Sequence, residues 1–491
     1  MNTQVQKAIV IGSGVGGLAT AIRLARRGYH VTVFEAQSHF GGKMTRIEKD
    51  GYFWGFGPSL LTMPFLIDEL FTLCGKNPAD YYQYHRVDPI CKYFYPDGTR
   101  LCSSSDAEVF ARELEEKLGE PRKNTLQYLQ EIRRIYDLTR NVFLFRSLHK
   151  WSTYLRFSTL WSVLQLHRIR VWETMNQANV RRFSTSKAVQ LVNRYATYNG
   201  SDPYVAPATL NVIAHPEYNQ GGYIMEGGMP ALSAALYRLA QDMGVQFQFD
   251  SRVSRICTEG KRATGVMVQE QFHAADCVVS NMDVVYTYQQ LLPQVPPPQR
   301  NMDEARSFSG LVFYFGVKKS FPELHLHNIL FSADYPKEFA LLEKGDELSD
   351  DPTIYIFISK KMNPDHAPEG CENWFIHINA PAHKGQDWSQ IVPRMREIIL
   401  QKISRHLGED VRPLIVTESV NTPESIQQKT LSYTGSLYGA SSNNRFAAFL
   451  RHPNFSRQFT NLFFCGGTVH PGGGVPLCLL SAQIIDEQIL A

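Results

Sequence analysis

The chain has 491 residues, 43% of them hydrophobic, which is enough for two domains or one large composite domain with a sizeable core. Its formal net charge of +3 is nearly balanced and excludes a general affinity for polyanions such as nucleic acid. The eight cysteines have no paired spacing, which indicates a reducing compartment and argues against a disulfide framework or a zinc site. We find no signal-peptide pattern and no apolar run of transmembrane length, so we expect a cytoplasmic protein and leave peripheral membrane attachment open.

The first 35 residues show the order of elements of a dinucleotide-binding unit. The apolar run at residues 8–11 predicts a buried parallel strand, and residues 12–17 then fit the pattern G-x-G-x-x-G. Apolar residues at helical spacing follow, Gly28 ends this helix, and His30–Phe34 predicts a second strand with Glu35 at its end. We expect the solvent face of the helix to carry three arginines, Arg23, Arg26 and Arg27.

Each glycine of the pattern has a physical task. Gly12 permits a tight turn after Ile11, Gly14 lets a pyrophosphate approach the backbone, and Gly17 lets the helix pack closely on the strand. The free N–H groups of the helix start, around Val15 and Gly16, then face the phosphates. Glu35 lies twenty-three residues after Gly12, near the spacing at which a carboxylate binds ribose hydroxyl groups.

The next segment favours FAD over NAD. Ala36 is followed at a short distance by Gly41, Gly42 and Lys43. This arrangement resembles the E-A-x-x-x-x-G-G-[KR] extension of the amine-oxidase-like flavoproteins, which runs along the FAD pyrophosphate. The resemblance implies FAD as the cofactor.

Further segments resemble the bacterial-type carotenoid (phytoene) desaturases, a family of such flavoproteins. Residues 51–64 are similar to their second segment, although Gly55 stands where those proteins have an acid; the shared positions are Gly57, Pro58, Ser59 and Leu60. The strand pair expected at residues 244–256 resembles the one whose valine meets adenine, which makes Val253 the candidate. Residues 277–283 resemble a strand and turn close to the cofactor, which adds Asn281.

The end of the chain matches the family as well. A predicted strand at residues 462–465 ends at Gly466 and Gly467, and a turn rich in glycine and proline then starts the last helix. This resembles the G-[AG]-x-x-x-P-G-G-G-V-P motif, in which backbone N–H groups reach a flavin edge or phosphate. The resemblance implies cofactor contacts from Gly474, Val475 and Pro476.

Residues 193–216 carry the most specific resemblance. Their sequence, NRYATYNGSDPYVAPATLNVIAHP, is similar to a segment of the 1-hydroxy-carotenoid 3,4-desaturase branch of the family. The resemblance implies a C3–C4 desaturation of a 1-hydroxylated acyclic or monocyclic carotenoid. A hydroxyl group buried in an apolar tunnel needs a hydrogen-bond partner, and we name Asn199, Ser201 and Asn211 as candidates.

The implied reaction introduces a double bond into a long polyene, with FAD as hydride acceptor and oxygen or a quinone as terminal acceptor. No catalytic base can be assigned from the sequence, and orientation of the substrate beside the flavin is our hypothesis for catalysis. Phytoene or diapophytoene desaturation is the alternative within the family. A flavin amine oxidase and a non-catalytic carotenoid-binding or prenyl-binding flavoprotein stay open as more distant alternatives. We expect no metal site, because His325 and His327 alternate on a strand without further ligands at suitable spacing.

Residues 140–172 form an unusual segment. They interleave arginine and lysine with tryptophan, tyrosine and phenylalanine, and residues 141–172 contain no acid. This composition suits an anionic membrane surface, and a helical pair with buried aromatics and a solvated basic face is the alternative.

The whole pattern predicts an α/β fold: a Rossmann-like FAD-binding domain with an inserted α+β substrate domain and a helical segment that contacts the membrane. We expect the FAD-binding domain at residues 1–75, 220–300 and 431–491. Residues 76–219 would form the substrate and membrane-contacting region, and residues 301–430 the sheet of the substrate domain.

Overall fold

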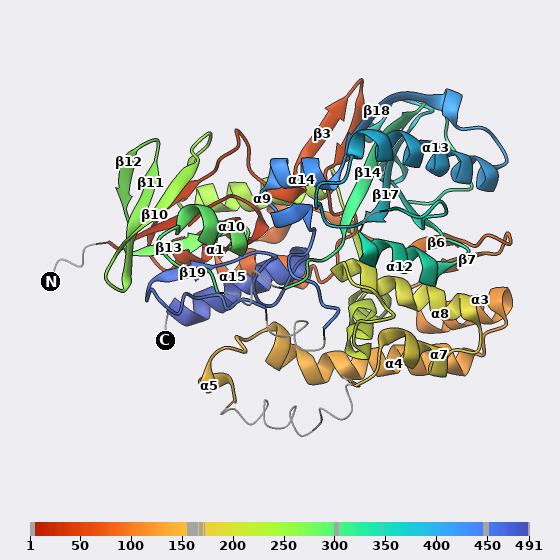
Figure 1. Ribbon diagram of the computed structural model, residues 1–491, viewed down its shortest axis with the longest axis horizontal. Coiled ribbons are helices and arrows are strands. Elements are labelled where there is room, and N and C mark those ends of the chain that lie inside the picture. Colours follow the sequence, from red (N-terminus) through yellow and green to blue (C-terminus); the bar gives the residue numbers. More distant parts are fainter. Residues whose placement is uncertain are drawn as a thin grey trace.

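In the computed structural model of the chain, residues 5–154, 165, 170, 172–298, 304–345, 347–444 and 451–489 are described. A parallel sheet with its helices forms one end of the molecule, and a larger mixed sheet with a helical layer forms the other (Figure 1). The chain crosses between the two ends several times, so each end contains segments that are distant in sequence.

The parallel sheet combines strands from three distant parts of the chain. Its order is β19-β13-β1-β2-β9, and each pair of neighbours runs parallel. β1 and β13 are apolar over nearly their whole length because both faces of the sheet are covered there: helices lie on one face, and a small antiparallel sheet with the helical turns at residues 284–291 lies on the other. The bounds are β1 Lys7–Ile11, β2 His30–Phe34, β9 Gln246–Gln248, β13 Cys277–Ser280 and β19 Leu462–Phe464.

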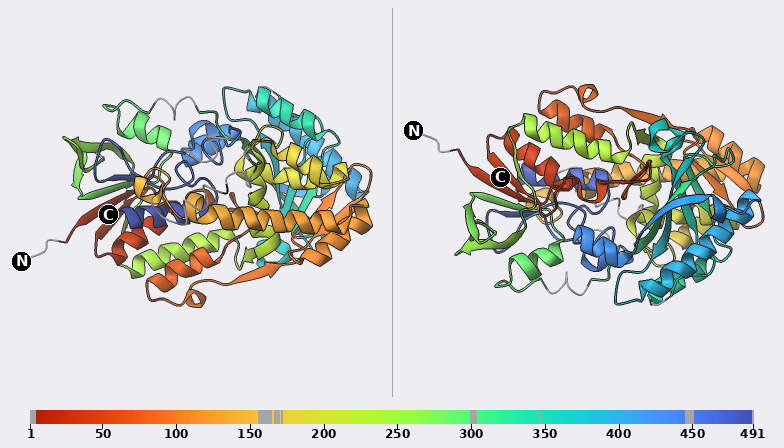
Figure 2. Two further views of the ribbon diagram at one scale, coloured as in Figure 1. Left: turned by 90° about the horizontal axis from the view of Figure 1, so that it is seen from below. Right: turned by 90° about the horizontal axis from the view of Figure 1, so that it is seen from above.

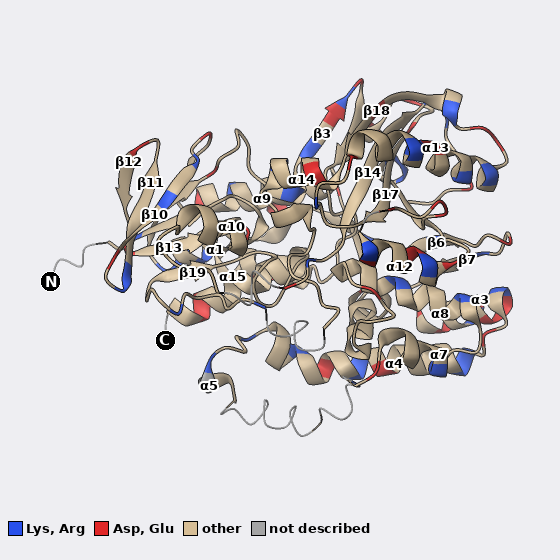
Figure 3. Cartoon of the chain, in the orientation of Figure 1, with Lys and Arg blue, Asp and Glu red and all other residues tan. Residues whose placement is uncertain are grey.

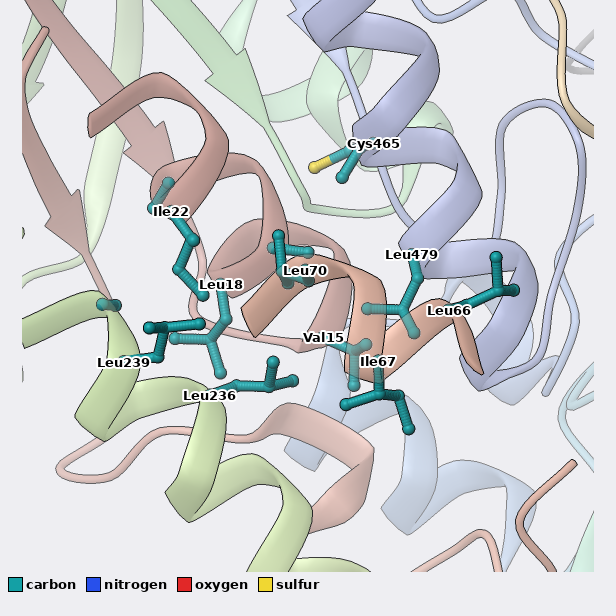
Figure 4. Close-up of a cluster of buried hydrophobic side chains, with 14 of the residues drawn as sticks. Val15, Leu18, Ile22, Leu66, Ile67, Leu70, Leu236, Leu239, Cys465 and Leu479 are labelled. Carbon is teal, nitrogen blue, oxygen red and sulfur yellow. The ribbon is translucent and has the colours of Figure 1, made fainter. Parts of the chain in front are cut away.

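Four helices share one apolar core with this sheet. They are α1 (Val15–Arg26), α2 (Phe65–Leu73), α9 (Met229–Asp242) and α15 (Val475–Ile489). Figure 4 shows leucine and isoleucine side chains of these helices pointing toward one another. Burial of each such side chain contributes about 1.5–3 kcal/mol. The core thereby fixes where α1 and α15 begin, directly after glycine-rich turns at the carboxyl edge of the sheet.

The expected exposure of the α1 arginines is wrong for Arg23. Arg26 is exposed, but Arg23 is only 5% exposed and lies within 3.6 Å of carboxylates of both Glu69 and Asp486. Arg27 is half-buried and donates to the Asp486 backbone carbonyl at 2.8 Å. α15 covers this face of α1, and helical spacing alone could not reveal a second helix there.

The strand pair expected at residues 244–256 is also wrong. β9 joins the edge of the parallel sheet beside β2, whereas β10 (Val253–Glu259) pairs antiparallel with β11 (Arg262–Val268). β12 (Gln271–Ala274) completes this separate three-stranded sheet.

The second large sheet has seven strands in the order β18-β14-β17-β16-β15-β6-β7. It is antiparallel except for the parallel pair β15 and β6. Side chains alternate along β14, so Leu311 and Phe313 pack toward α13 (Trp388–Leu407) while Val312 and Tyr314 face the opposite side. The strand bounds are β6 Cys91–Phe94, β7 Arg100–Ser103, β14 Ser309–Val317, β15 His327–Leu330, β16 Ile354–Ile358, β17 Glu372–Ala380 and β18 Ile415–Asn421.

Two short sheets and several helices complete the described chain. The short sheets pair β3 (Arg46–Lys49) with β4 (Tyr52–Gly55) and β5 (Tyr84–Val87) with β8 (Gly222–Met225). The remaining α-helices are α3 Ala107–Leu118, α4 Arg122–Thr139, α5 Trp151–Tyr154, α7 Met175–Arg182, α8 Ser186–Asn193, α10 Val284–Tyr286, α12 Tyr335–Lys344 and α14 Pro423–Thr430.

The helical layer lies below the seven-stranded sheet, and α4 runs along the lower face of the molecule (Figure 2, left). A π-helical turn, Arg140–Leu144, continues α4, and much of the basic aromatic segment at 155–171 lies outside the described residues. Residues 193–216 form short helical turns that include Arg194–Asn199 and Ala208–Ile213. Among the described helices, none combines the length and the apolar character needed to cross a membrane.

Candidate functional site

The turn between β1 and α1 is built from glycine because neighbouring atoms leave no room for side chains. Gly12 has a φ of +92°. A Cβ on Gly16 would lie 2.7 Å from Asn281 Oδ1 and 2.8 Å from the backbone nitrogen of Gly466, and one on Gly17 would lie 2.1 Å from the Gly12 carbonyl oxygen. The first glycine-rich turn, the Asn281 side chain and the backbone of Gly466 therefore meet at the carboxyl edge of the sheet.

The carboxylate of Glu35 is fixed at the end of β2 by this turn. Its Oε2 accepts hydrogen bonds from the N–H and the hydroxyl of Ser13, both at 2.7 Å, and its Oε1 accepts one from the N–H of Gln37 at 2.9 Å. A carboxylate at this position can accept hydrogen bonds from ribose hydroxyl groups.

Lys43 is a half-buried cation next to the same turn. Gly41 and Gly42 adopt positive φ angles of +104° and +56° just before it. Its Nζ donates to the carbonyl oxygens of Leu437 at 3.1 Å and Ser436 at 3.4 Å. Burial lowers the pKa of Lys43, and the charge of Asp283 opposes this shift.

Residues 57–60 connect the region of the turn between β1 and α1 to the seven-stranded sheet. A Cβ on Gly57 would lie 2.7 Å from the Lys43 carbonyl oxygen, which explains the glycine. The hydroxyl groups of Ser59 and Tyr355 share a hydrogen bond of 2.6 Å, and Tyr355 belongs to β16. Residues 57–60 thus form a continuous connection from Lys43 to the seven-stranded sheet.

The second glycine-rich turn lies between β19 and α15. The N–H of Gly466 donates to Ser481 Oγ of α15 at 2.9 Å, which ties the turn to the helix. The first N–H groups of α15, from Val475 onward, have no acceptor within the helix. They suit an electron-rich or anionic group in front of the helix.

Arg451 is a second cation at the site, and this one is fully buried; the sequence did not indicate it because no recognisable motif surrounds it. It is 2% exposed, and its guanidinium donates to the Tyr438 carbonyl at 2.6 Å, Asn199 Oδ1 at 3.2 Å and Ser442 Oγ at 3.3 Å. Burial lowers its pKa to about 10. Within the described part of the chain, neither Arg451 nor Lys43 forms an ion pair with a carboxylate.

A single continuous cavity of about 710 Å³ joins all these groups. Of the predicted cofactor-binding residues, only Ser13 and Gly17 do not line it. The predicted residues that line it are Gly12, Gly14, Gly16, Glu35, Ala36, Gly41, Gly42, Lys43, Gly57, Pro58, Ser59, Leu60, Val253, Asn281, Gly466, Gly467, Gly474, Val475 and Pro476.

The other part of the cavity is mainly apolar. Its walls come from the seven-stranded sheet, from the turn at Ala208–Ile213 and from the end of α4 with the π-helical turn that follows. His377 of β17 also lines it, and burial lowers the pKa of His377 to about 4, so this imidazole is neutral at neutral pH. The apolar lining residues include Tyr136, Phe143, Leu144, Leu210, Ile213, Val312, Ile329 and Phe375.

A cluster of five polar residues lies in this mainly apolar wall. We call it the Arg194 cluster; it consists of Tyr93, Arg194, Tyr195, Tyr198 and Glu217. Arg194 and Glu217 form an ion pair of 3.0 Å between side chains that are 4% and 1% exposed. Phenol groups occupy further hydrogen-bonding positions of both partners. The sequence did not predict this cluster, because its members are spread over 125 residues and follow no recognisable spacing.

The candidate partners for a substrate hydroxyl group are placed differently from our expectation. Only Asn199 lines the cavity, and its side chain binds Ser442 at 2.6 Å as well as Arg451. Ser201 and Asn211 are buried behind the wall.

His327, which we considered for metal binding, takes part in a hydrogen-bond network instead. Its Nδ1 lies 2.7 Å from the Tyr355 hydroxyl. No group of three or more potential metal ligands occurs among the residues that the structure describes.

The fold and the site define a flavoprotein. A dinucleotide with a flavin ring fits this site. Its phosphates would meet the two glycine-rich turns, where a Cβ would collide with its neighbours, and the two cations, Lys43 and Arg451. Its ribose would meet the carboxylate at the end of β2. The chain belongs to the flavin-containing amine oxidoreductase family, whose model matches residues 15–485. Its cofactor is FAD.

Individual proteins resemble the chain over nearly its whole length. It is 46% identical over 484 residues to a 1-hydroxycarotenoid 3,4-desaturase of Flavobacterium sp. (strain P99-3), with 99% of each chain covered. It is 37% identical over 495 residues to a 4,4'-diapolycopene oxygenase of Methylomonas sp, with 99% of this chain and 98% of that protein covered. The crystal structure of an oxidoreductase from Methanosarcina mazei shares the fold, with a TM-score of 0.66 at 15% identity over 98% of this chain and 100% of that one.

Proposed function

We propose that the protein is an FAD-dependent desaturase that introduces a C3–C4 double bond into a 1-hydroxylated acyclic or monocyclic carotenoid. The 46% identity to the Flavobacterium desaturase along 99% of both chains carries this proposal. The segment that resembles that branch, residues 193–216, contributes to the cavity wall, which supports a role in substrate recognition.

The shape of the cavity supports a long apolar substrate. It continues from the glycine-rich turns to the apolar walls, so a polyene placed along these walls would reach the flavin site. Walls from β14, β16 and β17 would exclude water and hold the reacting bond in one orientation.

We infer that the predicted cofactor-binding residues that line the cavity hold FAD. Bound FAD supplies the two-electron acceptor that removal of two hydrogens from a carbon–carbon bond requires. Of the carboxylates that line the cavity, Glu35 binds Ser13, Glu217 binds Arg194, and Asp283 accepts from the N–H groups of Val285 and Tyr433. Each carboxylate therefore has a structural partner, and orientation of the substrate beside the flavin is our hypothesis for catalysis.

We infer that residues 140–172 contact a membrane, from which the substrate enters. Within the described residues of this segment, Trp172 is 74% exposed and Tyr154 is 38% exposed, which suits an interface that accepts aromatic rings. Phe143 and Leu144, just before this exposed part, line the cavity. Elsewhere along the described chain, acidic and basic residues are interspersed (Figure 3). We expect the protein to sediment with anionic vesicles and to sediment less with zwitterionic ones.

The deciding experiment is a product assay in liposomes with FAD-loaded protein. We expect loss of two hydrogens and a red-shifted absorption spectrum with a 1-hydroxylated carotenoid and no conversion of phytoene. Conversion of phytoene alone would contradict the proposal. Oxygen or a quinone would accept the electrons, and anaerobic turnover with and without added quinone would distinguish the two.

A second candidate is oxidation of a carotenoid end group, favoured by the 37% identity to the Methylomonas oxygenase. The same assay separates the two reactions, because the oxygenase product gains oxygen whereas the desaturase product only loses hydrogen.

A further inference from the structure

The Arg194 cluster is an unusual element for an apolar cavity. Arg194 and Glu217 lose their hydration on burial, and the surrounding phenol groups replace the lost hydrogen bonds only in part. Arg194 Nε lacks a hydrogen-bond partner. A buried ion pair in this setting is a weak source of stability, so a role in function is a better explanation.

Two tyrosines of the cluster make the same bonds but differ in position. The Tyr195 hydroxyl donates to Glu217 Oε1 at 2.6 Å and accepts from Arg194 Nη2 at 2.9 Å. The Tyr198 hydroxyl donates to Glu217 Oε2 at 2.9 Å and accepts from Arg194 Nη1 at 3.0 Å. Tyr195 is fully buried and does not line the cavity, whereas Tyr198 lines it and is 37% exposed.

The Tyr198 phenol has hydrogen-bonding capacity left. A tyrosine hydroxyl has one donor hydrogen and two acceptor lone pairs, and the cluster uses the hydrogen and one lone pair. Because Glu217 fixes the hydrogen, the remaining lone pair can accept a hydrogen bond from a ligand that approaches through the cavity.

Tyr198 shares the cavity with residues that lead to the glycine-rich turns. Tyr355 of β16 lines the cavity as Tyr198 does. Tyr355 in turn binds Ser59, which belongs to the turn next to Lys43. In a 1-hydroxylated substrate, the hydroxyl carbon is two bonds from C3, so a hydroxyl-binding group has to lie near the reacting bond.

We propose that Tyr198 is the residue that selects the hydroxylated substrate, by accepting a hydrogen bond from the tertiary hydroxyl group at C1, with Arg194 and Glu217 as positioning residues. This inference rests on the proposed function and adds the site of recognition. A substrate without the hydroxyl leaves both internal bonds of Tyr198 intact, so it is not rejected absolutely. We expect the hydroxyl group to raise kcat/KM by about 10- to 100-fold.

The test compares two variants and two substrates. Tyr198→Phe removes the phenol that faces the cavity, and Tyr195→Phe removes the phenol with matching partners behind the wall. Each variant and the wild type would be loaded with FAD and assayed in liposomes with 1-hydroxy-1,2-dihydrolycopene and with 1,2-dihydrolycopene, which differ only in the hydroxyl group. FAD content and thermal midpoint are recorded for each preparation.

The ratio of kcat/KM for the two substrates is the decisive quantity. We expect Tyr198→Phe to bring this ratio to within about threefold of unity, mainly through kcat/KM for the hydroxylated substrate, and Tyr195→Phe to keep the wild-type ratio. An unchanged ratio in Tyr198→Phe, or an equal fall in both variants, would overturn the inference while leaving the desaturase reaction established. Failure of the wild type to desaturate either substrate would instead refute the proposed function itself.

Discussion

The carboxylate of Glu35 receives two hydrogen bonds of 2.7 Å from one residue, Ser13, through its backbone N–H and its hydroxyl. The second residue of the glycine-rich turn thus orients the acid at the end of the neighbouring strand. Since Glu35 lines the cavity and Ser13 does not, Glu35 is the group that a ribose would meet.

Glu35→Ala is expected to weaken FAD binding by about 10- to 100-fold, the loss of hydrogen bonds to a charged acceptor. Ser13→Ala is the matched control: it removes the hydroxyl bond and keeps the N–H bond, so we expect a loss of only a few-fold. Quenching of flavin fluorescence on binding measures both dissociation constants. Equal losses in both variants would contradict direct binding of FAD by Glu35.

Gly16→Ala should damage the fold as well as the cofactor site. The added Cβ would meet the backbone nitrogen of Gly466 at 2.8 Å, and a backbone atom cannot move aside as a flexible side chain can. We expect a loss of about 3 kcal/mol in the free energy of unfolding, together with loss of FAD.

Gly98→Ala is the control for this substitution. Gly98 has a φ of +86° with no heavy atom within 4 Å of an added Cβ, so only the backbone conformation is strained. We expect a cost of about 1 kcal/mol and unchanged FAD content. Chemical unfolding and the ratio of flavin to protein absorbance measure the two effects; normal FAD content in Gly16→Ala would argue against the close approach seen here.

Arg451→Met should reduce the stabilisation that FAD gives to the protein. Arg451 lines the cavity without a carboxylate partner among the described residues, so a negatively charged ligand lowers the free energy of burying it. We expect a smaller rise in thermal midpoint on FAD addition than in the wild type. Lys402→Met is the control, because Lys402 is buried but pairs with Asp351 at 2.6 Å and does not line the cavity. It should lower the midpoint with and without FAD by the same amount.

Stability should fall as the pH decreases from about 6.5 toward 4, partly because of His452. Burial lowers the pKa of His452 to about 4, and its neutral ring lies between the Pro453 carbonyl and the Tyr288 hydroxyl. In the unfolded chain a histidine titrates near 6.5, so the unfolded state binds more protons between these two values. One such histidine lowers the free energy of unfolding by about 2 kcal/mol at pH 5 relative to pH 8.

His452→Asn should therefore reduce the difference in unfolding free energy between pH 8 and pH 5, whatever its effect at pH 8. His85→Asn, the same substitution at an exposed histidine, provides the control. A His452→Asn variant with the full wild-type pH dependence would show that other groups cause the acid instability.

Short sequence motifs predicted part of the site. The two glycine-rich turns, Glu35 and Lys43 all belong to such motifs, and the structure brings them together at one cavity. The family resemblance supplied positions that spacing alone could not, such as Val253 and Asn281.

The errors arose where a distant segment decides the outcome. Arg23 is buried because α15 covers it, and β9 pairs with β2 although β10 is closer in sequence. The Arg194 cluster joins Tyr93 to Glu217 across several elements. Such contacts depend on tertiary packing, which neither helical periodicity nor strand alternation encodes.

The order of the parallel sheet has a consequence for biosynthesis. β13 needs β19 as its outer neighbour, and the first glycine-rich turn needs Gly466 beside it, yet both come from the last part of the chain to leave the ribosome. Until then, β13 presents an unpaired apolar edge, which is prone to association with other chains. We therefore expect the cofactor site to be completed only after β19 and the turn at Gly466 have been made, and the edge of β13 to be open to such association while residues 281–461 are synthesised.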